Sequence, residues 1–403
     1  MQPSTTSPRT KLEITLLLAS FAIFLTTSLV VAVELPRGRG NDEDGHATYV
    51  RYVTDYHRLP DPRSIDFGVN REPHQPPLYY LGGSLWLRAA RAVGLSQDSV
   101  RLYSTVVGAV WFWLVWLIAR RLLPVGQRVL PSLTLASLPM AAQLAGTVNN
   151  DILEITLATL MLYAAVRVWQ GSTRRELRTW YVLAALAGAG ALLSKFFALG
   201  AVTVVAAALT YRAIKTKQLP AWLLGLTLAA LPVIAFAAHN YATTGVLLPE
   251  LNLGANPYVA AYRDPWDATT FLPFAAITWQ TFIGRLGSWD IGLPTWFYLT
   301  HLAAWLAALA GLVRTKVHRL IVLAAVAFAA SWPAYVYLNL SFFQPQARYV
   351  YAGLIGALLL AAVGWSALAQ RLLARRVRAP WIVPALALVA FDLAGLVVTL
   401  LAL

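Results

Sequence analysis

Residues 13–33 read EITLLLASFAIFLTTSLVVAV, and this run decides the fold class of the chain. Its only charged residue is Glu13, and it is long enough to cross the roughly 30 Å hydrocarbon core of a bilayer as a helix. No small-residue cleavage site precedes Glu34, so the run does not resemble a removable signal peptide. We interpret it as a retained signal-anchor helix.

Similar apolar runs recur along the 403 residues, of which 58% are apolar and only 12% are charged. Lipid tolerates only helices or a closed barrel, and unbroken Leu, Ala and Val runs without strict alternation exclude the barrel. The sequence therefore predicts an all-α polytopic membrane protein with about eleven transmembrane helices and external juxtamembrane helices, forming one membrane-embedded domain over 1–403. The predicted spans are 12–33, 99–119, 129–147, 151–169, 179–194, 196–211, 220–238, 296–313, 320–338, 350–368 and 380–401. Cysteine is absent, which excludes disulfides, thiolate metal ligands and cysteine nucleophiles.

Basic residues predict the orientation of these spans. The formal net charge is +14, but if the N-terminus is cytoplasmic and 77–94 does not cross, 19 of the 32 basic residues lie in short cytoplasmic loops. This is the positive-inside pattern rather than a nucleic-acid footprint, so we expect no nucleic-acid partner. The stretch 77–94 is then an interfacial helix on the outer surface, because its crossing would reverse every later loop. We expect a multi-pass protein of the plasma membrane whose active site faces outside.

Two long segments then lie outside the membrane, 34–98 and 239–295. The first holds nine of the 18 acidic residues and is the predicted catalytic loop. The second includes an apolar stretch, 270–286, that we also expect in the membrane interface. A solvated loop that keeps an exported surface soluble is the simpler explanation for the acids, but they cluster with histidine and aromatic residues in two short groups.

The two acidic groups are NDEDGH at 41–46 and EPHQPPLYY at 72–80. In the first, Asp42 or the residue before it is a natural helix cap, and the helix dipole keeps the carboxylates ionised. In the second, three prolines restrict an elbow that carries Glu72 and His74. An ionised carboxylate at a membrane surface can act as a base or bind a divalent cation. For His74, a surface imidazole bonded to the backbone is an equally good explanation.

Three further signals fall on the same predicted side of the membrane. VNND at 148–151 places Asp151 at the outer end of one span, Lys195 lies between two spans, and Arg348 and Tyr349 stand at the outer mouth of another. An isolated ammonium and a forked guanidinium suit a phosphate. Helix capping by Asp151 and interfacial anchoring by Arg348 are the alternative interpretations.

The motifs DEDGH (42–46), EPHQPPLYY (72–80), NND (149–151), SK (194–195) and QARY (346–349) occur in this order between apolar spans. Together they resemble the integral-membrane glycosyltransferases of the GT-C superfamily, most of all the branch of bacterial aminoarabinose transferases and protein mannosyltransferases. The resemblance implies a GT-C-like fold. It also implies transfer of a sugar from a polyprenyl-phosphate donor to a glycan, lipid or protein acceptor outside the cytoplasm, with inversion.

The resemblance implies roles for individual residues as well. Asp42 is expected to activate the acceptor hydroxyl, with Glu43 in support, and Glu72 completes the catalytic group. A divalent Mg, Mn or Zn ion is an expected cofactor, with Asp42, Glu72 and Asp151 as its ligands. The expected substrate-binding residues are His74, Asp151, Lys195, Arg348 and Tyr349.

The main alternative function is a secondary transporter or lipid flippase. Such proteins place ionisable groups near the bilayer midplane on broken helices, often within internal repeats. Glu154 and Asp392 do lie inside predicted spans, but the acids concentrate in external loops and we find no convincing repeat. A structural or assembly protein is a weaker alternative, because it would not need clustered carboxylates. The sugar and the acceptor are left open by the sequence.

Overall fold

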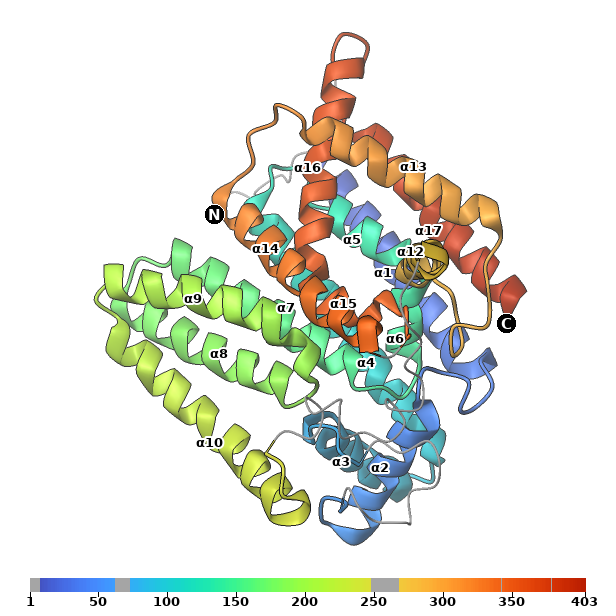
Figure 1. Ribbon diagram of the computed structural model, residues 1–403. Helices are drawn as coiled ribbons and strands as arrows, with labels where there is room; N and C mark the ends of the chain where they lie inside the picture. Colours follow the sequence, from blue (N-terminus) through green and yellow to red (C-terminus); the bar gives the residue numbers. More distant parts are fainter. Residues whose placement is uncertain (1–7, 62–72, 248–267, 342, 378) are drawn as a thin grey trace.

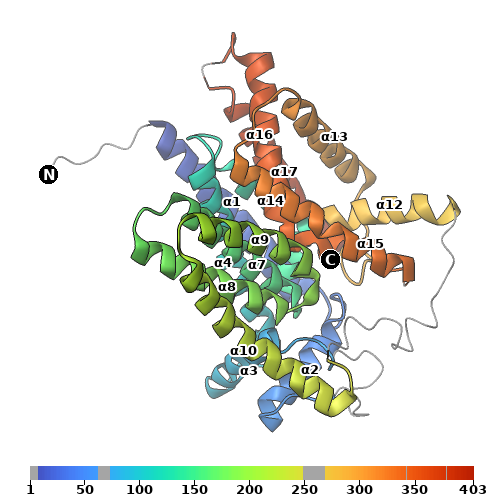
Figure 2. The same cartoon turned by 60° about the vertical axis from the view of Figure 1, so that its left-hand side comes forward.

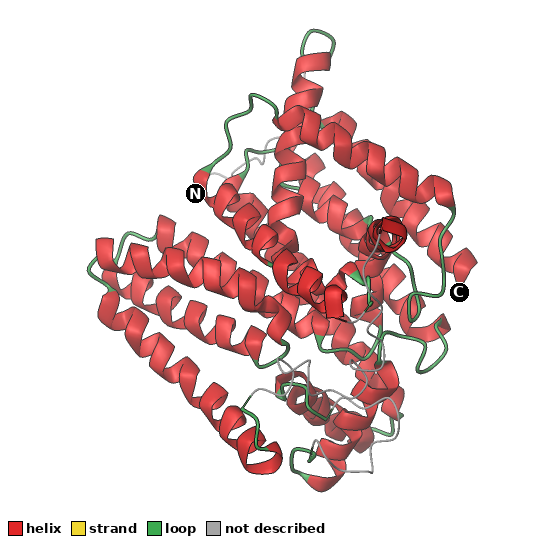
Figure 3. Ribbon diagram, viewed as in Figure 1, coloured by secondary structure: helices red, strands yellow, loops and turns green. Residues whose placement is uncertain are grey.

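The computed structural model describes residues 8–61, 73–247, 268–341, 343–377 and 379–403. Over these ranges the chain consists of helices and loops, and its one β-type contact is an isolated bridge between Leu286 and Ile291 (Figure 3). The predicted all-α polytopic class is confirmed.

The helices follow the predicted spans closely. The α-helices are α1 (Pro8–Glu34), α2 (Glu43–Tyr56), α3 (Leu78–Ala92), α4 (Val100–Leu122), α5 (Leu130–Ala136), α6 (Pro139–Gly146), α7 (Asp151–Gln170), α8 (Arg174–Leu192), α9 (Leu199–Lys215), α10 (Leu219–Thr244), α12 (Ala268–Ile283), α13 (Thr295–Leu312), α14 (Arg319–Ala330), α15 (Trp332–Ser341), α16 (Leu354–Leu373) and α17 (Ile382–Ala402). Short 3₁₀ segments are η2 (Gln97–Ser99), η3 (Phe196–Ala198) and η6 (Ala347–Gly353).

Nine helical segments in the described part of the chain are long and apolar enough to cross a membrane. The other two predicted spans differ from these nine. The stretch 129–147 forms the separate helices α5 and α6, and 179–194 lies largely in α8, which begins with the charged run RRELR. Every predicted span therefore coincides with helix, and the total of eleven crossings stays a prediction.

The break between α5 and α6 has a local cause. Pro139 has no N–H to donate, and it disfavours helical geometry at Leu138, whose backbone is extended with φ −100° and ψ 101°. The break frees the carbonyl of Ser137, which lies 3.1 Å from Nε2 of His301 on α13. The imidazole thus supplies a partner that a continuous helix would not need.

Figure 1 shows α8, α9 and α10 on one flank of the bundle and α12, α13 and α17 toward the other, with α4 and α7 nearer the middle; α9 packs directly on α14. Burial follows this arrangement. The most apolar stretch of each helix is buried to 61% in α4, 72% in α7 and 78% in the segment containing α16. The corresponding figure for α10 is 22%. Because α10 is just as apolar, its uncovered face is the one suited to lipid.

Helices α13 and α16 approach so closely that only glycine fits between them. A Cβ atom at Gly311 would lie 1.8 Å from the carbonyl oxygen of Gly364, and one at Gly364 would lie 2.0 Å from that of Ala308. Small residues at such crossings let backbones pack directly, as is common in membrane bundles.

Helices α2 and α3 pack on each other at one end of the bundle (Figures 1 and 2). The rings of Tyr49 on α2 and Tyr80 on α3 stack with centroids 3.7 Å apart. The predicted helix at 77–94 is present as α3, and it is not among the nine segments suited to crossing. Its position in the membrane interface stays a prediction.

Candidate active site

Four charged side chains from four separate segments meet where α2 begins. Arg348 of η6 donates from Nη2 to Asp42 Oδ2 at 2.7 Å and from Nη1 to Asp151 Oδ2 at 2.8 Å. Lys195 Nζ donates to the other Asp151 oxygen at 2.8 Å. We call Asp42, Arg348, Asp151 and Lys195 the charged row. Its signs alternate, so the ionised row carries no net charge.

Asp42 occupies the N-cap position of α2 in a left-handed conformation with φ 55°. The helix begins where the sequence predicted, but the Asp42 side chain makes no capping hydrogen bond and bonds Arg348 instead. Aspartate is among the residues that best tolerate this backbone region. The side chain is 42% exposed, against 0% for that of Arg348. The turn therefore presents an accessible carboxylate at the end of the row.

Asp151 is the first residue of α7 and is fully buried. Helix capping, the alternative interpretation of this residue, is performed by Asn149, whose Oδ1 accepts the N–H three residues further along at 3.1 Å. Asn150 fixes the turn by donating to Gln75 Oε1 at 3.0 Å and to the Ser194 carbonyl at 2.9 Å. Asp151 is left to pair with the two cations.

An aromatic wall borders the cations of the row. The ring centroid of Tyr349 lies 4.9 Å from Lys195 Nζ and 5.0 Å from Arg348 Cζ. Phe197 stacks on Tyr349 with centroids 4.4 Å apart. Desolvated cation–π contacts of this kind are worth about 0.5–2 kcal/mol each. The wall therefore restricts where both cations can move.

The row is ionised at neutral pH. Partial desolvation favours the neutral carboxyl of Asp42, but the guanidinium of Arg348 holds the pKa of Asp42 below its ordinary value. Burial favours the neutral amine of Lys195, but the carboxylate of Asp151 outweighs it and raises the pKa of Lys195.

Two histidines near the row are neutral. Burial and then the positive charge of Lys195 lower the pKa of His46 to about 3 and that of His74 to about 4. His74, an expected substrate-binding residue, is thus close enough to the row to respond to its charges, including that of Asp42. His46 lies within the DEDGH motif, but no sequence pattern assigned it a role.

Glu43, expected to support Asp42 in catalysis, is placed differently. It is buried in a two-pronged ion pair with Arg101, with Nε to Oε1 at 2.8 Å and Nη2 to Oε2 at 2.7 Å. It also accepts the N–H groups of Val148 at 3.0 Å and Gly40 at 3.3 Å. Its carboxylate therefore joins the segment 34–98 to α4 and does not enter the charged row. Arg101, hidden at the start of a predicted span, is the partner that sequence reasoning missed.

The carboxylates proposed as metal ligands do not fit a shared ion where the structure describes them. Arg348 lies between Asp42 and Asp151 and binds one oxygen of each. Glu72, the third expected ligand and an expected catalytic residue, lies outside the described residues. Elsewhere in the described ranges no three His, Asp or Glu side chains gather in a metal-binding group.

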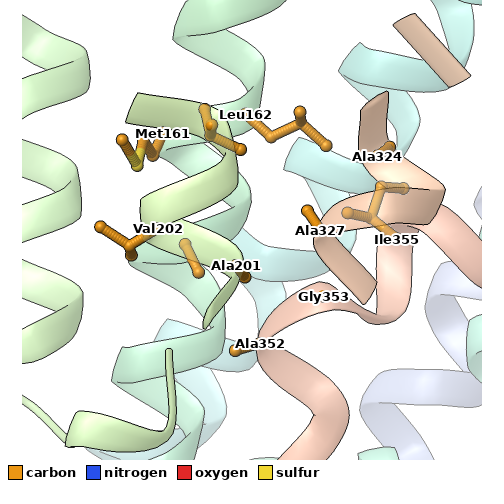
Figure 4. Close-up of a pocket in the computed structure, with 11 residues that line it drawn as sticks. Met161, Leu162, Ala201, Val202, Ala324, Ala327, Ala352, Gly353 and Ile355 are labelled. Atoms are coloured by element: carbon orange, nitrogen blue, oxygen red, sulfur yellow. The ribbon is translucent and has the colours of Figure 1, made fainter. Parts of the chain in front are cut away.

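A narrow apolar crevice runs into the bundle below η6. Its lining comes from α7, α9, α14, η6 and the start of α16, and it combines larger apolar side chains such as Met161 with alanines such as Ala158, Ala201, Ala327 and Ala352 (Figure 4). Its cavity volume of about 10 Å³ holds no more than one water molecule. The crevice is closed to any larger group in this conformation.

Comparison with known proteins agrees with this fold. Residues 60–364 match the family described as predicted membrane protein (DUF2142). The chain belongs to this family. No curated protein matches the sequence of this DUF2142 chain.

Solved structures add the fold. ArnT from Cupriavidus metallidurans in the apo state aligns with TM-score 0.58 and 14% identity, over 98% of this chain and 77% of ArnT. ArnT bound to undecaprenyl phosphate gives TM-score 0.59 at 14% identity, over 94% and 77%. AglB, the oligosaccharyltransferase of Archaeoglobus fulgidus, in complex with an inhibitory peptide and a dolichol-phosphate, gives 0.52 at 14%, over 95% of this chain and 55% of AglB. The DUF2142 chain thus shares the fold of ArnT and AglB, which confirms the expected GT-C-like fold.

Proposed function

We propose that this chain transfers a sugar from a polyprenyl-phosphate donor to the hydroxyl of a glycan, lipid or protein acceptor on the outer face of the plasma membrane. The observation that carries this proposal is the charged row, which sets an accessible carboxylate beside two buried cations. The fold shared with ArnT, which has been solved with undecaprenyl phosphate, supports the choice of donor.

Displacement at an anomeric carbon needs a base on the acceptor hydroxyl and positive charge near the departing phosphate. Ionised and accessible, Asp42 is the base that takes the hydroxyl proton. The new glycosidic bond forms as the bond from the anomeric carbon to the phosphate oxygen breaks, and the electron pair leaves with the phosphate. A single displacement of this kind inverts the anomeric carbon.

The charges of the row match this reaction. A donor phosphodiester carries one negative charge, and the departing phosphate monoester carries almost two at neutral pH. Asp42 loses its own charge on taking the proton, so one negative charge moves from Asp42 to the phosphate. Before the reaction Arg348 donates from Nη2 to Asp42 and from Nη1 to Asp151. When Asp42 is neutralised, Nη2 can donate to the departing phosphate while Nη1 stays bonded to Asp151. The total charge of the site stays constant throughout the step.

The polyprenyl chain needs an apolar path that opens to lipid. The crevice between α7, α9 and α14 has an apolar lining that includes Ala352, four residues after Arg348 (Figure 4). Separation of α14 from α9 would widen it without burying any charge. The amphipathic α3 and the apolar α12 are proposed to lie at the membrane surface beside the site.

The orientation of the chain can be tested directly because it has no cysteine. The proposal places Asp55, exposed on α2, outside and Ser172, exposed between α7 and α8, in the cytoplasm. In intact cells a membrane-impermeant maleimide is expected to label Asp55→Cys and to spare Ser172→Cys until the cells are lysed. The reverse labelling would overturn the proposed topology.

The activity is tested by slow hydrolysis of the donor in the absence of acceptor. The purified protein is given a panel of polyprenyl-phosphate sugars, and free sugar is measured for wild type, Asp42→Asn and Glu72→Gln. Asp55→Asn is the matched control, because Asp55 is an exposed acid on the same helix and pairs with Arg91, outside the charged row. Loss of hydrolysis in the first two variants and its retention in the control would support the proposal.

A transporter or flippase predicts a different result. In that case no sugar would be released by wild type, and vesicles containing the protein would move a solute or lipid in a way that depends on Asp392, which is fully buried in α17. That pair of results would replace glycosyl transfer with transport.

A further inference from the structure

His46 is buried beside the charged row, yet the transfer step described above does not use it. From its geometry we infer that His46 is a neutral hydrogen-bond donor that binds the phosphate of the lipid-linked donor through Nε2. This inference rests on the proposed function and adds a third phosphate contact to Lys195 and Arg348.

The first support is the position of the ring. His46 lies one helical turn after Asp42, and its backbone N–H donates to the Asp42 carbonyl at 3.1 Å. The residue is 1% exposed. Its Nδ1 lies 2.7 Å from the hydroxyl of Tyr80, which is itself fully buried and stacked on Tyr49. Packing from two helices therefore fixes the imidazole plane.

The second support is the tautomer. A phenol is a stronger acid than a neutral imidazole N–H, and an imidazole nitrogen is a stronger acceptor than a phenol oxygen. The favoured arrangement has Tyr80 donating to Nδ1, which places the imidazole proton on Nε2. The edge of the ring opposite Tyr80 then carries an N–H group.

The third support is that this N–H has no use in the resting protein. Nε2 is buried and makes no hydrogen bond within the described residues. A buried donor without an acceptor is costly, so such groups in native proteins call for an explanation. A ligand that brings an acceptor oxygen to this position supplies one.

The charges around His46 indicate what that ligand is. The charged groups that act on its ring are Lys195, Asp42, Asp151 and Arg348, contributed by four segments. Burial, with the two cations, opposes a positive imidazole and outweighs the two carboxylates, so His46 meets its ligand as a neutral donor. An anionic oxygen already attracted to Lys195 and Arg348 is the strongest acceptor that can reach this site.

Binding of undecaprenyl phosphate tests the inference, because this lipid carries the phosphate without a sugar. Its affinity for purified wild type is compared with that for His46→Ala, His46→Gln and Tyr80→Phe. His46→Ala is expected to weaken binding about 10- to 100-fold, the range for a hydrogen bond to a charged group. His46→Gln, which sets an amide N–H near the former Nε2, is expected to recover most of the loss.

Tyr80→Phe is expected to weaken binding several-fold. It removes the hydroxyl that keeps the imidazole proton on Nε2 but leaves the imidazole in place. The matched control is Tyr79→Phe. Tyr79 is the neighbouring buried tyrosine, and its hydroxyl contacts Ser104 at 2.7 Å and the backbone of Asn149, neither of which belongs to the charged row. Undecaprenol, which lacks the phosphate, is expected to bind all variants alike.

The outcomes separate the inference from the proposed function. If wild type binds undecaprenyl phosphate and folded His46→Ala binds it equally well, the inference is wrong and the proposed function stands. If wild type binds no polyprenyl phosphate, the proposed function fails. The ratio of wild-type to His46→Ala affinity is expected to stay constant from pH 5.5 to 8, while a ratio that grows below pH 6.5 would mean that a charged imidazole is the ligand and would overturn the neutral-donor inference.

Discussion

Replacement of Glu43 by glutamine tests whether the two neighbouring acids of the DEDGH motif, Asp42 and Glu43, have different roles. Glu43→Gln keeps the size of the side chain but removes the counter-charge of Arg101, whose side chain is only 7% exposed. Removing one partner of a buried ion pair typically costs about 3–5 kcal/mol. Arg101 keeps hydrogen bonds to the carbonyls of Ala32 at 2.9 Å and Leu35 at 2.7 Å, so we expect the lower end, about 3 kcal/mol.

The assay is thermal unfolding in detergent, followed by the fraction that stays monodisperse. At about 2 °C per kcal/mol for a chain of this size, Glu43→Gln is expected to lower Tm by roughly 6 °C. Arg101→Gln is expected to lower Tm by a similar amount. The double variant is expected to lose much less than the sum, because neither charge is then left buried alone.

Activity decides the interpretation of Glu43. Glu43→Gln is expected to hydrolyse donor at close to the wild-type rate once corrected for the folded fraction, because its carboxylate does not reach the charged row. A variant with unchanged Tm and no hydrolysis would refute this reasoning and return Glu43 to the catalytic group.

Further predictions concern the row, its pH dependence, metal removal and the bundle. Asp42→Asn is expected to slow transfer about 10²- to 10⁴-fold while Tm stays within about 2 °C of wild type, since Asp42 is accessible. A larger fall in Tm that accompanies the loss of activity would indicate a structural role instead. His46 and His74, with pKa values of about 3 and about 4, are neutral in the folded chain, but in the unfolded chain they take up protons near pH 6.5. Their contribution to stability is therefore complete above pH 6.5 and is lost as the pH falls toward 4. Tm measured against pH is expected to fall over this range. Because Arg348 occupies the space between the two carboxylates, addition of EDTA is expected to leave donor hydrolysis unchanged, and a loss restored by Mg²⁺, Mn²⁺ or Zn²⁺ would contradict this. Gly364→Leu is expected to prevent folding, whereas Gly245→Asn, at a helix end with open space around it, is expected to be tolerated.

Hydrophobic run length and loop charge predicted much of the fold. Each predicted span became helix because about 20 apolar residues in lipid have few other ways to satisfy their backbone. The same reasoning placed Asp42, Asp151, Lys195 and Arg348 on one side of the membrane, and the structure brings these four side chains into contact.

The sequence did not predict the directions in which neighbouring side chains point. Asp42 and Glu43 are adjacent, but Asp42 has a left-handed backbone while Glu43 begins the helix, so their side chains point apart and one meets Arg348 and the other Arg101. The pairing of Glu43 with Arg101 crosses 58 positions and leaves no periodic signal. The break at Pro139 was foreseeable from the proline itself, since it stands within a run otherwise suited to one long helix.

The hydrogen bond between Arg348 and Asp42 joins positions 306 apart in the chain. At a synthesis rate of 5–20 residues per second, Arg348 leaves the ribosome about 15–60 s after Asp42. Asp151 and Lys195, only 44 positions apart, can find each other much earlier as their helices enter the membrane. Asp42 cannot form this ion pair until Arg348 has been synthesised, so the charged row is completed last by its most C-terminal member.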